Sequence, residues 1–192
     1  DGPCVLALLG SGFQASKHLE AMRCVREITA VHVWSRTMSR AAEFAKSASV
    51  PVTVYESAEE AVRNADIICT LTPSPSPILK YSWLKPGAHV NAVGSCHPLQ
   101  QELDEECVTR AIMFCDTKEG CLKGLTRTGD LCAPIEKGVL SADSIAEIGN
   151  LLGSGWTRGS QDDITIFKSV GFAVEDLCSA VALYEKAKLE PE

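Results

Sequence analysis

The segment GSGFQA at residues 10–15 has the residue types and the spacing that bind a diphosphate. It follows the apolar run CVLALL and has the G-x-G-x-x-A form of a dinucleotide-binding turn. In such a turn Gly10 allows a tight exit from a strand, and Gly12 lets the backbone approach the pyrophosphate. Free N–H groups at the start of the following helix attract the anion. The turn therefore predicts dinucleotide binding, and the alternative is a merely structural strand-turn-helix.

The end of the next predicted strand indicates which dinucleotide is bound. An NAD site usually has an aspartate or glutamate there, about 20 residues after the glycines, that binds the ribose hydroxyl. This chain has Ser35, Arg36 and Thr37 at that point. A carboxylate would repel a 2′-phosphate, whereas the guanidinium of Arg36 can pair with it and the two hydroxyls can donate to it. The sequence therefore predicts NADP(H), with a solvated loop position for Arg36 as the alternative.

Small and hydroxyl-bearing residues follow further predicted strands. In an open α/β sheet the ligand lies beyond the carboxyl ends of the strands, at the switch point. Segments 70–72, 93–97 and 116–117 end there beside the Gly10 turn, and their small tips would leave room for a nicotinamide ring. The residues of these tips that we assign to the cofactor site are Thr70, Leu71, Thr72, Val93 and Ser95.

The sequence does not identify a catalytic residue. Cys96 and His97 are adjacent, so their side chains diverge and do not form a nucleophile–base pair. We interpret His97 as a solvent-facing loop residue rather than a catalytic one. Asp116 and Asp130 lie in loops that could face the site and supply a proton, but we interpret both as solvated turn residues.

The elements that position these residues follow from the alternation of apolar runs with helical patterns. Strands are expected at residues 4–9, 30–34, 52–55, 66–72, 88–93 and 111–116, and helices at 13–24, 39–47, 57–62 and about 172–188. This order predicts parallel βαβ units, and strands that are apolar on both faces predict helices on both sides of the sheet. The predicted fold class is therefore α/β, a Rossmann-type doubly wound, mostly parallel sheet. Residues 73–77 contain three prolines and must form a loop.

Composition argues against several classes of function. The net charge is −7 and the basic residues are scattered, so we expect no nucleic-acid partner. No apolar run approaches the roughly 20 residues of a membrane helix, and the N-terminal run lacks the features of a signal peptide. Nine cysteines without a C-x-x-C pair or zinc-type spacing indicate reduced thiols rather than disulfides or a metal site. We expect a cytoplasmic protein that binds no metal.

Beyond these motifs, nearly the whole chain resembles the ornithine cyclodeaminase/mu-crystallin family, and within it the mu-crystallin (ketimine reductase) branch. The segments that carry the resemblance are GSGFQA, WSRT, SAEEAVRNADII, LKPGAHVNAVGS, QQELDEE and FKSVGFAVEDL. The resemblance implies a Rossmann domain within a two-domain, usually dimeric NAD(P)H enzyme. The implied reaction is hydride transfer from NADPH to a cyclic C=N bond, which gives a cyclic amino acid.

The same resemblance assigns residues to parts of the cofactor. The residues that would hold the adenosine 2′-phosphate are Ser35, Arg36 and Thr37. Those that would lie along the diphosphate are Gly12, Phe13 and Gln14. The segments that would line the nicotinamide are those around Thr70, Val93 and Ser169-Val170.

The sequence departs from the family pattern at two points. Cys96 stands where ornithine cyclodeaminases have an aspartate that handles the substrate amine proton, and a thiol with a pKa near 8.5 is a poor substitute. Family members also have a substrate domain before the first Rossmann strand, where this chain begins. We therefore expect a Rossmann domain at residues 1–168 and a helical segment at 169–192 that returns toward the missing domain. Its apolar stripe, which includes Val174 and Val181, needs a partner surface.

Three functions remain open at this stage. The leading one is NADPH-dependent reduction of a small cyclic imine, by a protein that forms a homodimer in its full-length form. We expect the isolated 192-residue chain to bind NADPH but to turn over ketimine poorly. The second, also suggested by the resemblance, is cytosolic binding of thyroid hormone, in which NADPH shapes the pocket. The third is ornithine cyclodeamination, which Arg36 and Cys96 both disfavour.

Overall fold

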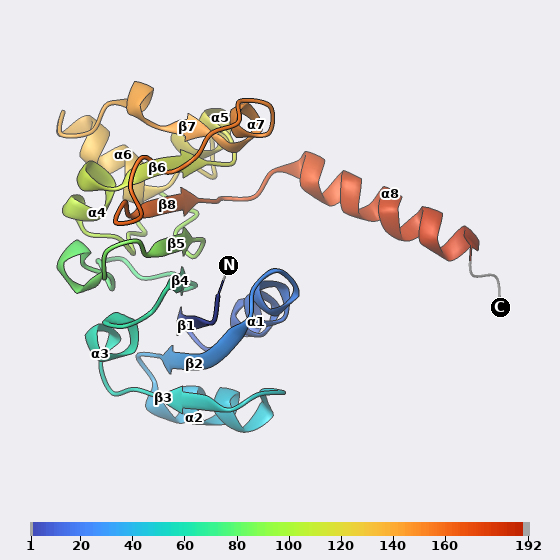
Figure 1. Ribbon diagram of the computed structural model, residues 1–192. Helices are drawn as coiled ribbons and strands as arrows, with labels where there is room; N and C mark the ends of the chain where they lie inside the picture. Colours follow the sequence, from blue (N-terminus) through green and yellow to red (C-terminus); the bar gives the residue numbers. More distant parts are fainter. Residues whose placement is uncertain (1, 190–192) are drawn as a thin grey trace.

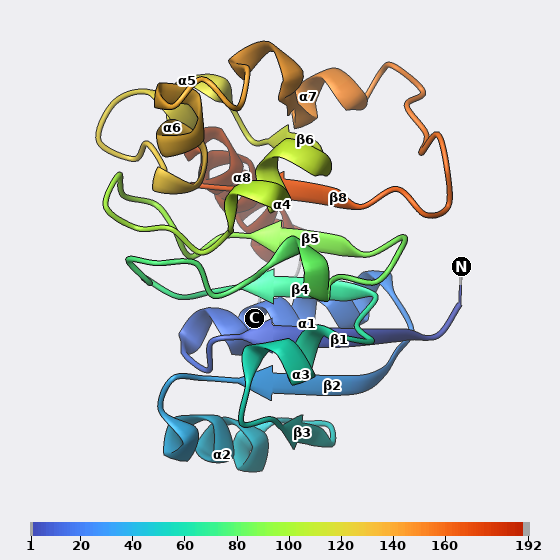
Figure 2. The same ribbon diagram turned by 90° about the vertical axis from the view of Figure 1, so that its left-hand side faces the viewer.

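The computed structural model describes residues 2–189, which form one eight-stranded parallel sheet with helices on both faces (Figures 1 and 2). The strand order is β3-β2-β1-β4-β5-β8-β6-β7. The strands are β1 (Cys4–Leu9), β2 (Ile28–Trp34), β3 (Val52–Val54), β4 (Ile67–Thr70), β5 (His89–Ala92), β6 (Ile112–Cys115), β7 (Ala146–Glu147) and β8 (Thr165–Lys168). The predicted α/β, Rossmann-type doubly wound sheet is confirmed.

Helices connect these strands and cover the sheet. The α-helices are α1 (Phe13–Val25), α2 (Met38–Ser47), α3 (Ala58–Val62), α4 (Glu105–Arg110), α5 (Lys118–Leu122), α6 (Gly129–Glu136), α7 (Ile148–Leu151) and α8 (Ala173–Leu189). Two short 3-10 helices are η1 (Tyr81–Trp83) and η2 (Ala142–Ser144). Figure 1 shows α1 and α2 on one face of the sheet and α3 and α4 on the other.

The hydrophobic core is divided between the two faces. Leu6 and Leu8 of β1 belong to the cluster formed with α1 and α2, whereas Ala7 and Leu9 belong to the cluster formed with α3, α4 and α6. All four side chains have no exposed surface. Burial on both faces explains why the strands read as continuous apolar runs rather than as alternating ones.

The strand ends differ from the sequence prediction where side chains compete for backbone groups. The fourth strand was expected to reach residue 72 but ends at Thr70, because the Thr72 N–H donates to the Glu102 carboxylate at 2.6 Å instead of to a neighbouring strand. Ser57 is the N-cap of α3. Its hydroxyl accepts from the Glu60 N–H at 3.2 Å and donates to the Glu60 carboxylate at 3.0 Å.

The second half of the chain contains elements that the hydrophobic pattern did not predict. These are the short elements α4, α5, α6, α7, β7 and β8. Strand β8 lies between β5 and β6, so that Lys168 faces Ala92 on one side and Cys115 on the other. Lys168 comes from the last quarter of the chain, and it therefore lies between two other strands of the sheet. It lies at the end of the sheet where the parallel strands stop. We call that end the carboxyl edge.

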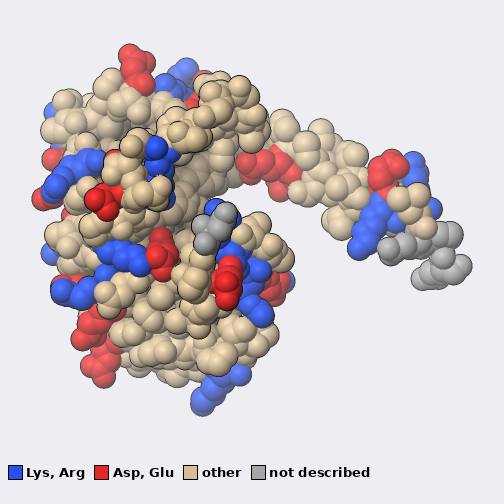
Figure 3. Space-filling model, viewed as in Figure 1, with Lys and Arg blue, Asp and Glu red and all other residues tan. Residues whose placement is uncertain are grey.

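The C-terminal helix is confirmed at residues 173–189 and extends away from the sheet (Figure 1). Within these described residues none of its side chains is buried, and much of its surface in Figure 3 is uncharged. Its large exposed apolar residues include Val174, Leu177, Val181, Leu183 and Tyr184. The predicted apolar stripe is present, whereas the proposed domain division at residues 168 and 169 stays a prediction.

Three further properties concern the described residues 2–189. None of their helices is long and apolar enough to cross a membrane. No group of three or more His, Cys, Asp or Glu side chains among them is arranged to hold a metal ion. All nine cysteines lie in this range and are free thiols, of which Cys69, Cys107, Cys115 and Cys121 are buried.

Candidate functional site

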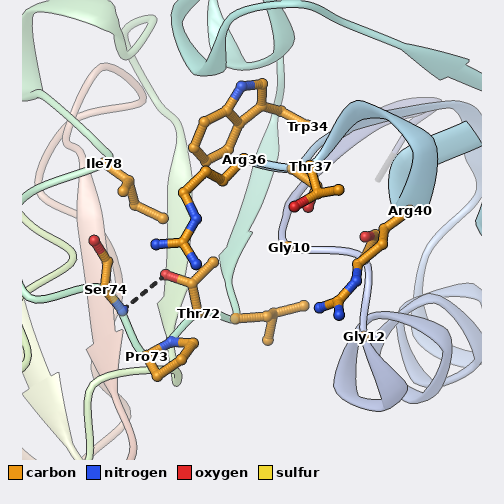
Figure 4. A pocket seen from close by; sticks show the side chains of 13 residues that line it. Gly10, Gly12, Trp34, Arg36, Thr37, Arg40, Thr72, Pro73, Ser74 and Ile78 are labelled. Carbon is orange, nitrogen blue, oxygen red and sulfur yellow. Dashed lines mark hydrogen bonds between the residues drawn. The ribbon is translucent and has the colours of Figure 1, made fainter.

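A cavity of about 310 Å³ lies at the carboxyl edge between the ends of β1, β2 and β4 (Figure 4). It is lined by Gly10, Ser11, Gly12, Trp34, Ser35, Arg36, Thr37, Arg40, Leu71, Thr72, Pro73, Ser74 and Ile78, and we call it the edge cavity. It brings together residues that the sequence analysis assigned to the cofactor from three separate segments. The members of that set are Gly10, Gly12, Ser35, Arg36, Thr37, Leu71 and Thr72.

Gly10 is required by the close packing of two strand ends. Its φ is +122°, and a Cβ built on it would lie 2.9 Å from the Leu71 carbonyl oxygen. The Gly10 N–H donates to the Trp34 carbonyl at 2.8 Å, which ties the turn to β2. Only glycine takes this conformation and this contact without strain, so the residue fixes the path from β1 into α1.

Gly12 differs from Gly10 because neither its backbone nor its neighbours require glycine. Its φ of −87° and ψ of −167° are open to any residue, and a Cβ there would meet no atom of the described residues within 4 Å. As N-cap of α1 it offers no side chain to the first N–H groups of the helix. A bare backbone that faces open space at the start of a 13-residue helix fits an anionic ligand that approaches the main chain closely. Phe13 and Gln14 follow in the exposed first turn.

Two guanidinium groups point into the edge cavity (Figure 4). One belongs to Arg36, as predicted, and the other to Arg40, which the sequence analysis missed. Arg40 lies in the first turn of α2, four residues after Arg36, and this spacing could have revealed it. Among the described residues, the cavity lining has two arginines and no carboxylate. That charge favours a ligand with a phosphate on the β2 side over one whose ribose hydroxyls need an acidic acceptor.

Two other predicted residues lie in the protein interior. Thr70 and Ser95 are fully buried. The Thr70 hydroxyl donates to Glu102 at 2.7 Å, and the Ser95 hydroxyl donates to the Gln100 carbonyl at 2.7 Å. Val93 follows β5 and is partly exposed. A contact between any of these residues and a nicotinamide stays a prediction.

Asp116 holds the segment that the resemblance placed beside the nicotinamide. Its Oδ2 accepts from the Ser169 hydroxyl at 3.1 Å, from the Val170 N–H at 2.8 Å and from the Gly171 N–H at 2.9 Å. Gly171 has a φ of +87°, which turns the chain out of β8 toward α8. Asp116 therefore fixes Ser169 and Val170 at the carboxyl edge.

The interpretation of Asp116 and Asp130 as solvated turn residues is wrong. Their exposed fractions are 5% and 0%. Asp130 Oδ1 accepts from the Glu102 N–H at 2.7 Å and the Leu103 N–H at 3.0 Å, and its Oδ2 lies 3.3 Å from the Lys168 ammonium. Both aspartates are buried because each satisfies backbone donors of another segment, residues 170–171 for Asp116 and residues 102–103 for Asp130. In contrast, the prediction that His97 faces solvent is confirmed, and the neighbouring Cys96 is exposed as well.

Glu102 is a buried carboxylate that sequence reasoning did not single out, although it lies in the segment QQELDEE. It accepts from Thr70 and Thr72 hydroxyls, each at 2.7 Å, and from the N–H groups of Thr72 at 2.6 Å and Gly94 at 2.9 Å. Burial raises the pKa of Glu102, and the charge of Asp130 adds to this, whereas the hydrogen bonds from Thr70 and Thr72 lower it. The carboxylate lies directly behind the wall of the edge cavity that Thr72 forms.

The fold and the edge cavity define a class of protein, the Rossmann-type nucleotide-binding proteins. A family model narrows the class, since the ornithine cyclodeaminase/mu-crystallin family matches residues 2–190. The chain belongs to this family, and the predicted resemblance is confirmed.

Curated relatives agree with this assignment. The chain is 40% identical over 184 residues to ketimine reductase mu-crystallin of Rattus norvegicus, covering 96% of this chain and 56% of the relative. It is 42% identical over 190 residues to Delta(1)-pyrroline-2-carboxylate reductase of Bacillus cereus, covering 95% of this chain and 57% of the relative. The chain thus spans somewhat more than half the length of these relatives.

Solved structures show the same fold. The Thermococcus litoralis Delta(1)-pyrroline-2-carboxylate reductase in complex with NADH and L-proline superposes with a TM-score of 0.89 at 34% identity, covering 96% of this chain and 58% of that chain. The iminosuccinate reductase of Paracoccus denitrificans in complex with NAD+ superposes with a TM-score of 0.85 at 28% identity, covering 98% of this chain and 58% of that chain. Both neighbours carry a nicotinamide dinucleotide without the 2′-phosphate, so this chain's own residues must indicate its preference.

The two glycines of the turn predict opposite phenotypes. Gly12→Ala should change the free energy of unfolding by less than about 1 kcal/mol, because alanine fits its backbone angles and its Cβ meets only open space. The same substitution should weaken dinucleotide binding about tenfold, because its methyl group would enter the space through which the ligand approaches the main chain. Such a loss corresponds to about 1.4 kcal/mol of binding free energy. Gly10→Ala should instead destabilise the fold by about 1–3 kcal/mol through backbone strain.

Urea unfolding and titration calorimetry with NADPH would measure the two effects on each variant. Wild-type affinity in Gly12→Ala would contradict a ligand that contacts the main chain there. Unchanged stability of Gly10→Ala would contradict the described turn.

The buried pair of Lys168 and Asp130 predicts a non-additive response. Lys168→Met should lower the free energy of unfolding by about 3–5 kcal/mol, because it leaves the Asp130 carboxylate without its countercharge. Adding Asp130→Asn should restore part of that stability, since the introduced amide is neutral and keeps one oxygen for the two backbone donors. Urea unfolding of both single variants and of the double variant checks this. Additive losses in the double variant would show that the ion pair is not coupled.

Proposed function

We propose that this chain binds NADPH in the edge cavity and serves as the cofactor domain of a reductase that acts on a small cyclic imine. The single observation that carries the cofactor proposal is the composition of the cavity. A bare backbone at Gly12 lies on one side, and two guanidinium groups, with no carboxylate among the described lining residues, lie on the other. The first suits a diphosphate, and the second suits the additional 2′-phosphate.

Within this proposal each part of the site has a distinct task. The open first turn of α1 holds the diphosphate by its N–H groups and its dipole. Arg36 and Arg40 bind the 2′-phosphate together with the hydroxyls of Ser35 and Thr37. The bound cofactor supplies the hydride that reduces a C=N bond. The segment at residues 169–170, fixed by Asp116, lies at the same edge of the sheet and borders the space for the nicotinamide.

The choice of an imine as substrate rests on the family. Two relatives that match nearly the whole chain are named for reduction of ketimines and of Delta(1)-pyrroline-2-carboxylate. Hydride transfer needs a well-positioned cofactor and acceptor more than it needs a nucleophile, which agrees with the exposed positions of Cys96 and His97. We extend the proposal to a homodimer of the full-length protein and to a location in the cytoplasm.

Arg36→Asp provides the test of the cofactor assignment. The substitution removes a phosphate partner and adds a repelling charge, so NADPH affinity should fall at least about tenfold more than NADH affinity, consistent with loss of a charge-assisted pair. Titration calorimetry with both nucleotides measures the two losses separately. Arg23→Asp is the matched control, because it makes the same charge change near the far end of α1, where Arg23 contacts Ser49. Equal losses of NADPH and NADH binding in Arg36→Asp would refute the preference.

The reaction is tested with the full-length protein. NADPH oxidation in the presence of a cyclic ketimine supports the reductase. Thyroid hormone added as a competitor, or ammonia released from ornithine with NAD, would reveal the hormone-binding or deaminase alternatives. Saturable hormone binding without ketimine turnover would overturn the proposed reaction while leaving the NADPH site intact.

A further inference from the structure

The loop at residues 73–77 forms part of the wall of the edge cavity, and the structure shows how it is held. The loop contains three prolines, so it has few N–H groups with which to pair to a neighbouring strand. Thr72 precedes it and Ile78 follows it, and both line the edge cavity. The position of this wall therefore depends on what holds the two ends of the loop.

A single residue, Glu102, holds both ends. Its side chain accepts from the Thr72 N–H at 2.6 Å and from the Thr72 hydroxyl at 2.7 Å. Its main-chain carbonyl accepts from the Ile78 N–H at 2.8 Å. Because the side chain and the carbonyl belong to one residue, Glu102 ties the two ends of the loop to each other, and the neighbouring Gln101 adds a contact within the loop by donating its N–H to the Ser74 carbonyl at 2.8 Å.

The same carboxylate also joins the end of β4 to the end of β5. Its second oxygen accepts from the Thr70 hydroxyl at 2.7 Å and from the Gly94 N–H at 2.9 Å. Gly94 packs so tightly here that a Cβ would lie 2.2 Å from the Thr72 nitrogen and 2.6 Å from Glu102 Oε1. The junction therefore leaves no space for a side chain at residue 94 and brings the carboxylate directly against both backbones.

Glu102 is itself fixed from behind. Asp130 accepts from its N–H at 2.7 Å, and Asp130 is paired with Lys168 on the central strand β8. All three side chains have no exposed surface. Buried charges are costly, and the attraction between Asp130 and Lys168 offsets part of that cost, although neither Asp130 Oδ2 nor the Lys168 ammonium has a hydrogen-bond partner among the described residues. A hydrophobic residue at 102 would fill the space more cheaply but would leave the donors of Thr72 without an acceptor.

We propose that Glu102 is a positioning residue for the edge cavity, whose buried carboxylate sets the direction in which the loops after β4 and β5 leave the sheet. The inference rests on the proposed function, because it assigns a role in dinucleotide binding to a residue that does not line the cavity. Glu102 acts through Thr72 and Ile78 and touches no ligand itself.

Glu102→Gln is the sharpest variant because it preserves shape and removes one acceptor. The introduced side chain offers one oxygen and one NH₂ group, so its NH₂ must face the N–H of either Thr72 or Gly94. The Gly94 N–H also reaches the Thr70 carbonyl at 3.0 Å, so the amide should turn its NH₂ toward Gly94. NADPH affinity should then fall about tenfold, as expected for one lost buried hydrogen bond. Hydrogen exchange of the free protein should rise at the Gly94 amide, which loses one of its two acceptors, and less at the Thr72 amide, which keeps its own.

Asp104→Asn is the matched control. Asp104 lies two residues further along the same segment and also accepts backbone N–H groups, from Cys107 at 2.9 Å and Tyr81 at 3.2 Å. These contacts support α4 and η1 and do not reach the edge cavity. Asp104→Asn should therefore lower the melting temperature without changing NADPH affinity or exchange at Thr72 and Gly94. Equal losses of affinity in the two variants would show a general effect of stability and would overturn the proposal.

A second pair of variants keeps the proposal testable where Glu102→Gln does not fold. Thr70→Val removes a donor to the carboxylate and Thr70→Ser retains it. Only the valine variant should weaken NADPH binding and raise exchange at Gly94. Unchanged affinity in Thr70→Val, or in a folded Glu102→Gln, overturns the role of Glu102. Absence of NADPH binding by the wild-type chain would instead contradict the proposed function, so the two failures are distinguishable.

Discussion

The structure depends on how closely backbones approach one another at the carboxyl edge of the sheet. Gly10 packs against the carbonyl of Leu71, and Gly94 packs against both the nitrogen and the oxygen of Thr72. A methyl group at either position would separate strands that must lie side by side for β1, β4 and β5 to end together. Because these ends are held so closely, the chain leaves each strand in a fixed direction, and the space beyond them becomes a cavity.

Basic and acidic groups are separated at this cavity: the basic groups line it, and the acidic groups are buried in the protein. Its wall toward solvent carries guanidinium groups and free N–H groups, which have no anion to pair with among the described lining residues. Behind the wall lies the carboxylate of Glu102. The carboxylates of Asp116, after β6, and Asp130, in α6, are also buried, and all three accept from backbone N–H groups. The acids therefore organise the loops, and the bases remain available to a ligand.

The sequence predicted what local patterns encode and missed what the tertiary structure decides. Apolar runs bounded by turns identified β1 to β6, and the glycine turn with Arg36 identified the cavity, because both signals lie within a few residues. Strand β8 was missed as a central strand since its place between β5 and β6 depends on contacts across the chain. Glu102 and Lys168 look like ordinary surface charges in the sequence. Only the fold shows that Glu102 is buried against Thr72 and Gly94 and that Lys168 is buried against Asp130.

The most direct test of the account is to map NADPH binding on the backbone amides of the folded chain by NMR. The account predicts saturable chemical-shift changes at the amides of residues 11–14 and 35–37, with smaller changes at 35–37 when NADH replaces NADPH. Changes confined to other surfaces, or no changes at a concentration at which the related reductases are saturated, would contradict it.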